Sequence, residues 1–480
     1  MAAPDEHMIL RHDQARYRDI ASHLVLRRRL TRSKFAEHKP GVSSELDEAP
    51  IDWVIALTLL IQKLLSIISS PLLWFGHLVE FFLNFFSLNG GFFGILPRLL
   101  TFSVVIPRRH AANFRSIICH IDGRYELFRS IFLSDYTSIE PIPGLDINPF
   151  CLSMMAAKLA YENGAFIENQ VKKYWKMHFV RFFNCWNKFL KVKGTQAFIC
   201  CDKADDANVI VLAFRGTEAF NAFDWITDVD LSWLSMGKYG KAHLGFMRAL
   251  GLQDEKDIEK GFPREHPELD EGRFIAYYAI RETLRELLEK HKRARIIITG
   301  HSLGGALAIL FPAILAMHEQ QDIIDRIHGV MTYGQPRVGD AEFGRNVSAV
   351  LKSKYHRMVY RYDIVPRVPF DKPPVALFKH FGTCIYFTSW YEGKVVEESP
   401  NPNYFHPLFL FSMYLSAVGD LTRAFLLGLL LKDFEEGYVS LLFRTSGLLI
   451  PGIASHSPRD YVNGGTMAKI IAQKILNSET

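Results

Sequence analysis

Two different hydrophobic patterns divide the chain near residue 148. From there onward, short apolar and β-branched runs alternate with stretches of helical periodicity. The runs read QAFICC, VIVLAF, ARIIIT, GVMTYG, RMVYRY and CIYFTS, and helices are expected over 274–290, 303–317 and 340–351. Strands that alternate with helices form mostly parallel sheets whose faces are covered. We therefore predict an α/β domain over residues 148–480.

Two more helices are predicted where this domain begins. The first covers CLSMMAAKLAYENGAFIENQ, residues 151–170, and the second covers residues 172–193. In the second, Lys and Arg lie opposite an aromatic stripe that consists of Trp175, Phe179, Phe182, Phe183, Trp186 and Phe189. A basic amphipathic helix of this kind fits a lipid surface, and packing on the domain core explains the same stripe equally well.

An almost uncharged stretch, residues 51–106, precedes the domain. Its formal charges are Asp52, Lys63, Glu80 and Arg98. The first half is long enough to cross a bilayer core, but Pro71 closes it, and Asn89-Gly90-Gly91 and Pro97 interrupt the second half. We expect two apolar segments joined near Pro71, either as a re-entrant hairpin or as helices lying in a membrane interface. Two transmembrane helices and a helix pair buried in a soluble core are the alternatives.

The net charge and the cysteines of the chain indicate which partners and which compartment to expect. The net charge of the 480-residue chain is +5, so we expect no nucleic-acid partner. Residues 1–50 are polar and poorly periodic, and their basic group LRRRLTRSK fits either anionic lipid headgroups or a solvated arm. The six cysteines have neither metal-ligand nor disulfide-framework spacing, and the first 30 residues lack the apolar core of a secretory signal. A reducing compartment and no bound metal are therefore expected.

The strongest chemical signal lies where the run ARIIIT ends. Gly300-His301-Ser302-Leu303-Gly304 follows a predicted strand and opens a predicted helix. A serine at such a turn has a strained backbone that needs small neighbours, and Gly300 and Gly304 provide them. The helix N-terminus then directs free N–H groups at the charge that develops on a substrate oxygen. We predict that Ser302 is a nucleophile, and the alternative is a glycine-rich turn that packs a helix on the sheet.

A serine nucleophile needs a base and an acid that orients it, in the chain order Ser, acid, His. Asp363 follows a predicted strand, where α/β sheets present catalytic groups, and is preferred to Asp340 and Asp371. His456 lies on a late loop and is the predicted base. The other histidines considered lie on a helix, at strand starts or on an earlier loop: His318, His328, His356 and His380. A plain turn aspartate and a solvated loop histidine are the alternatives.

The reaction also needs two donors that form an oxyanion hole. One is the backbone N–H of Leu303, directly after the nucleophile. The other is expected in VLAFRGTE, where Gly216 permits a sharp turn after a strand and Thr217 offers both an N–H and a hydroxyl. A simple strand-ending turn is the alternative.

These motifs together resemble the class 3, or fungal-type, triacylglycerol lipases of the α/β-hydrolase superfamily. The resemblance rests on GHSLGGALA, FRGTE, TYGQPRVGD and YDIVPRVP with a late histidine, and it covers about residues 148–477. It implies a triad of Ser302, Asp363 and His456, an oxyanion hole at Thr217 and Leu303, and no metal or organic cofactor. The segment after Thr217 matches the lid of that family, and Trp225 is its expected apolar tip.

Two features set the chain apart from the secreted members of that family. They are the apolar region 51–106 and an apolar insertion at about 406–447, between the predicted acid and base. Both features resemble those of the plant oil-body lipases. This resemblance implies that the protein lies on a lipid-droplet surface, with the catalytic domain on the cytosolic side. The endoplasmic reticulum membrane is the alternative location. The expected parts are thus a polar segment 1–50, the apolar region, a connecting segment 107–147 and the hydrolase domain.

The expected activity is hydrolysis of triacylglycerol, and of diacylglycerol and monoacylglycerol, through an acyl-enzyme. A phospholipase or galactolipase of the same fold is one alternative. A non-catalytic droplet coat or signalling protein is another.

Overall fold

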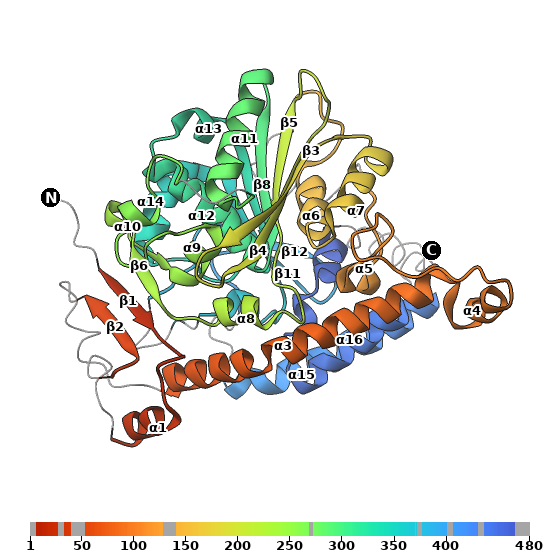
Figure 1. The fold of residues 1–480 in the computed structure, drawn as a ribbon, viewed down its shortest axis with the longest axis horizontal. Coiled ribbons are helices and arrows are strands. Elements are labelled where there is room, and N and C mark those ends of the chain that lie inside the picture. Colours follow the sequence, from red (N-terminus) through yellow and green to blue (C-terminus); the bar gives the residue numbers. More distant parts are fainter. Residues whose placement is uncertain are drawn as a thin grey trace, which may run out of the picture.

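The computed structural model describes residues 6–26, 33–39, 53–127, 141–267, 272–369, 371, 377–400, 407–430 and 436–465. Its centre is a sheet with the strand order β12-β11-β10-β9-β8-β5-β4-β3 (Figure 1). The strands are β3 (His178–Asn187), β4 (Val192–Cys201), β5 (Val209–Phe214), β8 (Arg295–His301), β9 (Ile327–Tyr333), β10 (Tyr355–Tyr360), β11 (Thr383–Phe387) and β12 (Gly393–Val396). Strands β5 and β8 to β11 run parallel, and β3, β4 and β12 add antiparallel edges. The predicted α/β fold with a mostly parallel sheet is confirmed.

Helices cover both faces of this sheet. Helix α6 (Pro149–Leu159) packs on one face, where it contacts β5, β8 and β9. On the other face lie α9 (Leu244–Leu250), α11 (Ala276–Lys290), α12 (Leu303–Met317) and α14 (Ala341–Leu351). Short helices α7 (Gly164–Asn169), α10 (Ile258–Gly261) and α13 (Gln321–Arg326) complete the domain. Every residue of β5 is buried, as expected for a strand covered on both sides.

The helix predicted over residues 172–193 is wrong, because residues 178–187 form β3 and β4 begins at Val192. Along β3, Phe183, Cys185 and Asn187 are buried whereas Asn184, between the first two, is exposed, which is the two-residue period of a strand. The spacing of Phe179, Phe182, Phe183 and Trp186 is compatible both with the helical period and with a strand that has aromatic residues on both faces, and aromatic residues favour strands. The stripe therefore packs in the sheet domain and is not a lipid-binding helix.

The helix predicted over residues 151–170 is divided into α6 and α7. The predicted helix is interrupted before Gly164, because the side chain of Asn163 accepts a hydrogen bond from Phe166 N at 3.0 Å and so caps α7 as a new helix. The division lets the chain turn from the sheet face towards β3.

Part of the N-terminal segment is folded, although its sequence is poorly periodic. Strand β1 (His7–Leu10) lies between β2 (Ala36–Lys39) and β6 (Trp233–Ser235), and β7 (Lys241–His243) completes a second sheet. Helix α1 (Tyr17–Leu26) connects β1 to β2. Strands of three or four residues are too short to show a period in the sequence. Most of the basic group, residues 27–32, lies outside the described residues.

The apolar region forms one long helix where two segments were expected. Helix α3 (Trp53–Leu88) runs through Pro71, so the bend predicted there is wrong. The chain turns instead at Gly90 and Gly91, whose φ angles of +81° and +76° are readily adopted by glycine, and continues as α4 (Gly91–Leu100). Among the described residues, α3 is the helix that is long and apolar enough to cross a membrane by length and composition.

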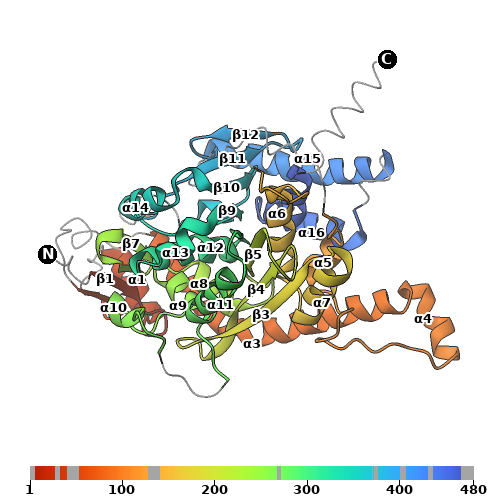
Figure 2. The ribbon, with the colours of Figure 1, turned by 90° about the horizontal axis from the view of Figure 1, so that it is seen from above.

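Two buried asparagine side chains hold the returning chain against α3, so that the region is hairpin-shaped (Figure 2). Asn89 Nδ2 donates to the carbonyl of Val105 at 2.8 Å, and Asn89 Oδ1 accepts from Val105 N at 2.8 Å. Asn84 pairs in the same way with the backbone of Arg115, with both bonds at 2.8 Å. These bonds satisfy backbone groups that would be costly to leave unpaired in apolar surroundings.

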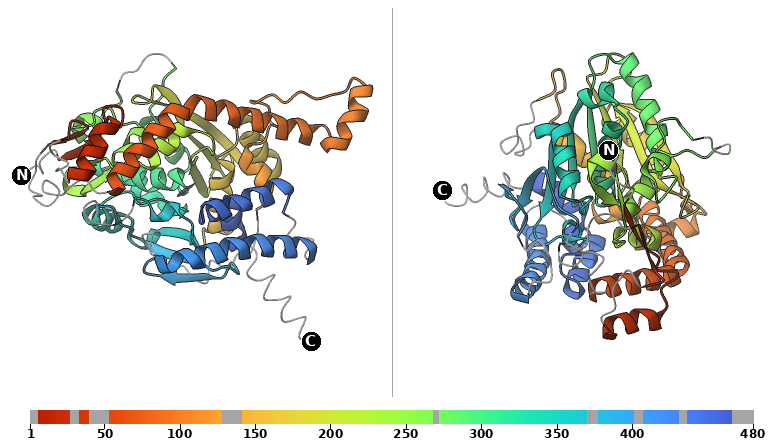
Figure 3. Two further views of the ribbon diagram at one scale, coloured as in Figure 1. Left: turned by 90° about the horizontal axis from the view of Figure 1, so that it is seen from below. Right: turned by 90° about the vertical axis from the view of Figure 1, so that its left-hand side faces the viewer.

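The insertion before His456 forms α15 (Pro407–Leu430) and α16 (Tyr438–Leu449). Both helices lie on the same side of the molecule as α3 (Figures 1 and 3). Helix α16 contacts α5 (Ile117–Ile121), and α8 (Ala222–Asp228) packs between α3 and the sheet domain. Buried ion pairs fix the insertion, for example Arg423 with Asp420 and Arg444 with Asp460, each at 3.1 Å.

Candidate active site

Ser302 lies at the sharp turn between β8 and α12, where the sequence predicted it. Its backbone angles are φ 59° and ψ −132°, a left-handed conformation that is strained for a residue with a side chain. A Cβ atom at Gly300 would clash with the backbone of Gly304, and one at Gly304 would clash with Phe214 O. The small residues around Ser302 are therefore required by close backbone contacts.

His456 lies within hydrogen-bond distance of both other predicted residues. His456 Nε2 is 2.8 Å from Ser302 Oγ, and His456 Nδ1 is 2.9 and 2.8 Å from the two carboxylate oxygens of Asp363. Asp363 follows β10 and is completely buried, whereas His456 ends a 3-10 turn (Ala454–His456) that comes directly after α16. Three residues that are distant in the sequence thus form one hydrogen-bonded chain from a buried carboxylate to a serine hydroxyl.

Further contacts hold the carboxylate in place. The hydroxyl of Tyr461 donates to Asp363 Oδ2 at 2.5 Å, and Val365 N donates to Asp363 Oδ1 at 2.9 Å. A Cβ atom at Gly334, which has φ +58°, would lie 2.8 Å from Asp363 Oδ2 and 2.9 Å from His456 Cε1. The space beside the Asp363–His456 pair therefore requires glycine, and the sequence analysis identified neither Gly334 nor Tyr461.

His301 supports the turn and does not extend the hydrogen-bonded chain. Its Nδ1 is 2.8 Å from the hydroxyl of Tyr161, and its ring centre is 4.5 Å from that of His456. Burial, and then the neighbouring His456, hold the pKa of His301 well below its usual value. His301 is therefore neutral and packs beside the base without competing for its proton.

The predicted oxyanion-hole loop lies against the same turn. A Cβ atom at Gly216 would clash with His301 O and with Tyr161 Oη, so the loop after β5 touches the serine turn. Thr217 Oγ1 donates to Asp228 Oδ2 at 2.6 Å, which fixes the Thr217 side chain. Leu303 is the first residue of α12, where backbone N–H groups have no partner within the helix.

Asp228 was not identified from the sequence as part of the site. Burial raises its pKa to about 8, although the Thr217 hydrogen bond favours the ionised form. The other carboxylate oxygen of Asp228, Oδ1, is buried without a hydrogen-bond partner among the described residues. Asp228 therefore holds Thr217 while it is largely protonated at neutral pH.

The predicted lid segment covers the site from the side of α3. Trp225 lies on α8, is half-buried, and donates from Nε1 to Ala219 O at 3.1 Å. Gln62 Nε2 of α3 donates to Ile226 O at 3.3 Å, and the rings of Phe75 and Phe220 pack edge to face at 5.6 Å. The apolar helix α3 therefore contacts the segment that the sequence predicts to be the lid.

The alternative acids and bases lie elsewhere in structural roles. Asp340 caps α14 by accepting from Phe343 N, and Asp371 pairs with Lys379 at 2.6 Å. His318 Nδ1 bonds to the hydroxyl of Tyr277, and the ring nitrogen of His380 bonds to Pro366 O. None of these residues contacts Ser302.

The parallel sheet, the serine turn at the end of β8 and the Ser302–His456–Asp363 arrangement are those of an α/β-hydrolase. The model of the family described as lipase (class 3) matches residues 211–372. Triacylglycerol lipase OBL1 of Nicotiana tabacum is 42% identical over 87% of this chain and 83% of its own length. Triacylglycerol lipase OBL1 of Arabidopsis thaliana is 39% identical over 95% of this chain and 94% of its own length. The chain belongs to the class 3 lipase family.

A more distant similarity extends to enzymes of polar lipids. Phospholipase A1-IIbeta of Arabidopsis thaliana is 28% identical over 42% of this chain and 47% of its own length. This similarity is consistent with the phospholipase alternative.

Proposed function

We propose that the protein hydrolyses the ester bonds of triacylglycerol, with Ser302 as nucleophile, His456 as base and Asp363 as the group that orients the base. The 2.8 Å contact between His456 Nε2 and Ser302 Oγ carries the proposal, because a serine hydroxyl attacks an ester only when a base removes its proton. Asp363 holds Nδ1–H of His456, so that Nε2 faces the serine in the basic form.

The reaction then follows from the geometry of the site. Ser302 Oγ attacks the ester carbonyl while His456 takes its proton, and the negative charge develops on the carbonyl oxygen. The N–H groups of Leu303 and Thr217 stabilise this oxyanion. His456 returns the proton to the departing alcohol, and a water molecule then releases the fatty acid from the acyl-enzyme.

Access to Ser302 requires a movement of the covering segment. Ser302 is 2% exposed, so a triacylglycerol cannot reach its hydroxyl in this arrangement. We assign the lid role to α8 and its flanks, with the half-buried Trp225 as the side chain that turns towards lipid. Opening this segment at a lipid surface exposes apolar residues where they remain out of water.

The location proposed for this reaction is the cytosolic side of a lipid droplet. Large apolar side chains are exposed along α3, α4, α15 and α16, which lie on one side of the molecule. They include Leu64, Ile67, Trp74, Phe82, Phe92, Phe93, Leu96, Leu100, Phe411, Leu415, Val418, Leu442 and Leu449. We call this set the apolar face. An exposed apolar patch of this size marks an interaction surface, and a monolayer of phospholipid over stored acylglycerol fits it without a membrane-crossing segment.

A substrate panel tests the function. Wild-type protein is expected to release fatty acid from triolein faster than from phosphatidylcholine or galactolipid, and Ser302→Ala to lose this activity by at least about 10³-fold. Faster release from phosphatidylcholine supports a phospholipase. Equal measurable rates in wild type and Ser302→Ala contradict the assignment of the nucleophile, whereas no release of fatty acid from any of the three lipids favours a non-catalytic coat protein.

A further inference from the structure

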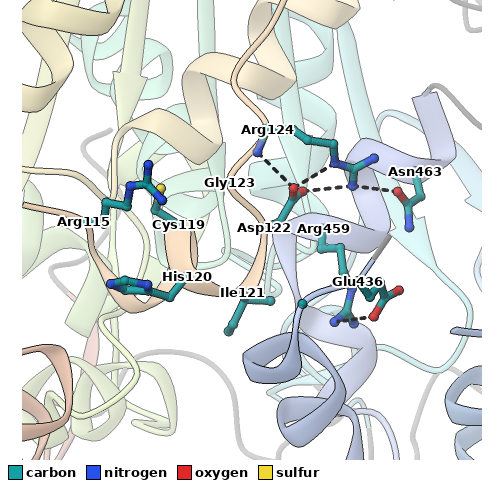
Figure 4. Close-up of a pocket in the computed structure, with 11 residues that line it drawn as sticks. Arg115, Cys119, His120, Ile121, Asp122, Gly123, Arg124, Glu436, Arg459 and Asn463 are labelled. Carbon is teal, nitrogen blue, oxygen red and sulfur yellow. Dashed lines mark hydrogen bonds and ion pairs between the residues drawn. The ribbon is translucent and has the colours of Figure 1, made fainter. Parts of the chain in front are cut away.

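A polar pocket of about 280 Å³ lies between α5 and the start of α16 (Figure 4). The guanidinium groups of Arg115, Arg124 and Arg459 line it, together with His120. Its volume is close to the lower end of the range for small-ligand sites. The residues that line the pocket include none of the proposed catalytic groups, and the hydrolysis described above does not use it.

The carboxylates in the pocket wall are already neutralised by cations. Asp122 Oδ1 accepts from Arg124 Nε at 2.8 Å, and Asp122 Oδ2 is 3.0 Å from Lys158 Nζ. Glu436 Oε2 accepts from Arg444 Nε at 2.8 Å. The wall acids are therefore not free to balance an additional cation at the pocket, so the pocket favours an anion.

Three nitrogen groups of the pocket lack an acceptor. Arg115 is exposed and forms no ion pair with any described residue. Nε of Arg459, whose side chain is 1% exposed, and Nε2 of His120 are buried without a hydrogen-bond partner within the described part of the chain. The guanidinium of Arg115, which has no acceptor among the described residues, therefore favours a ligand rich in acceptor oxygens.

The pocket is also joined to the apolar face on two sides. The backbone of Arg115 is bonded to Asn84 of α3, and Glu436 lies two residues before the first residue of α16, Tyr438, which is 92% exposed. In a lipid monolayer, phosphate groups lie just outside the acyl chains. A cationic pocket bordered by two apolar helices therefore lies at the depth of the phosphate when the apolar face contacts lipid.

We propose that this pocket binds the phosphate of a phospholipid headgroup, an inference that rests on the proposed action at a lipid surface. Arg115 and Arg124 hold the phosphate oxygens at the open side through charge-assisted hydrogen bonds, and the buried guanidinium of Arg459 adds positive charge behind them. The bound headgroup fixes the orientation of the protein on the monolayer, with α3 and α16 on either side of the pocket.

Flotation with triolein droplets tests this proposal, using the full chain with Ser302→Ala so that no lipid is consumed. Droplets are coated either with phosphatidylcholine, whose headgroup contains phosphate without net charge, or with digalactosyldiacylglycerol, which contains no phosphate. Arg115→Glu is the test variant, because the Arg115 side chain is exposed and forms no ion pair within the described part of the chain, so its replacement leaves the buried ion pairs intact. Lys203→Glu, an exposed residue between β4 and β5, is the control with the same charge change.

The proposal predicts that Arg115→Glu weakens binding to phosphatidylcholine-coated droplets about tenfold and to galactolipid-coated droplets less than twofold. Arg115→Lys is expected to restore part of the loss, and Lys203→Glu to have no effect on either coat. Equal losses on both coats, or no loss, overturn the proposal. Inorganic phosphate is the third probe: if it saturates an Arg115-dependent site while the two coats bind alike, the pocket takes a free anion and the headgroup assignment is wrong. These outcomes do not depend on hydrolysis, which the substrate panel tests separately.

Discussion

Among single residues, the buried carboxylate of Asp363 depends on its neighbours for its position. Its oxygens accept from His456, Tyr461 and Val365, and no water-exposed surface remains on the side chain. A carboxylate held by several donors keeps the imidazole in one orientation during proton transfer. Tyr461 is therefore a positioning residue that acts through Asp363.

Tyr461→Phe removes one hydrogen bond to this carboxylate while it keeps the ring. We expect kcat for a soluble ester to fall about tenfold per active site with KM within twofold, since the hydrogen bond to a charged group is worth about 1.5 kcal/mol. Steady-state kinetics, normalised by titration of the reactive serine, make the measurement. A loss of titratable sites at unchanged kcat would instead indicate a purely structural role.

The carboxyl of Asp228 makes stability depend on pH in a predictable direction. Burial raises its pKa to about 8 in the folded protein, from about 3.9 in an unfolded chain. The folded state therefore binds this proton more tightly, and its stability falls as the pH rises from about 4 to about 8.

Asp228→Asn keeps an acceptor for Thr217 but cannot ionise. The free energy of unfolding of the variant minus that of wild type is expected to increase by at least about 1 kcal/mol from pH 5 to pH 8. Urea unfolding in detergent at both pH values measures the change, with the exposed Asp205→Asn as the control. An unchanged or opposite difference would show that Asp228 is ionised in the folded protein.

Sequence motifs predicted the three residues that the fold brings together, Ser302, Asp363 and His456, but not those that support them. Ser302 follows from a local motif, because the glycines that permit its backbone conformation are its sequence neighbours. Tyr461 and Asp228 act through partners far along the chain or on another element, and a single tyrosine or aspartate has no local pattern that reveals such a contact. Their roles could be recognised only from the folded arrangement.

At the scale of whole elements, α3 is both an apolar helix and a support for the lid segment. It contacts α8 through Gln62, and Phe75 packs against Phe220. A Cβ atom at Gly76 would lie 2.5 Å from the Cβ atom of Phe220, so this contact leaves no room for a side chain. We therefore expect a displacement of α3 on lipid to move the proposed lid segment as well.

Gly76→Leu is expected to displace the lid segment from α3. We predict that hydrolysis of a soluble short-chain ester without a lipid surface rises several-fold, because Ser302 becomes more accessible. Ser70→Leu, which adds the same side chain at an exposed position of α3, is the matched control and should leave the rate unchanged. A decrease in rate in Gly76→Leu with normal folding would contradict the proposed link.

Element prediction succeeded where one period dominated and failed where two were satisfied. The helix over 303–317 was predicted with its exact bounds, because an apolar helix follows a strand after a single turn. The aromatic residues of β3 are compatible with both the helical and the strand period. Helix α3 continues on both sides of Pro71, so this proline does not mark the end of the helix. Short strands such as β1 and β6 gain their stability from each other, which no local pattern records.

Considered as a whole, the molecule brings two distant apolar segments to one side. The region before the domain supplies α3 and α4, and the insertion before His456 supplies α15 and α16 (Figure 3). The sequence analysis recognised both segments as apolar, yet their alignment depends on buried ion pairs and on the Asn84 and Asn89 contacts.

Both halves of the apolar face are expected to contribute to droplet binding. Two double variants test this: Phe92→Ser with Phe93→Ser in α4, and Phe411→Ser with Leu415→Ser in α15. Each should weaken droplet binding at least tenfold, and their effects on the binding free energy should add. Flotation with triolein droplets measures the loss. Phe274→Ser, an exposed aromatic residue outside the face, is the control. Full binding after loss of the α15 pair would show that α3 and α4 alone form the contact.

The central claim is that Ser302 is made reactive by His456, and covalent labelling tests it most directly. A fluorophosphonate reacts with a serine only when a neighbouring base removes its proton, and mass spectrometry identifies the modified peptide. On triolein droplets, where the proposed lid is open, we predict complete labelling at Ser302 in the wild type, and loss of labelling in His456→Ala although Ser302 is still present. Labelling at another serine, or labelling of Ser302 that persists in His456→Ala, would contradict the account.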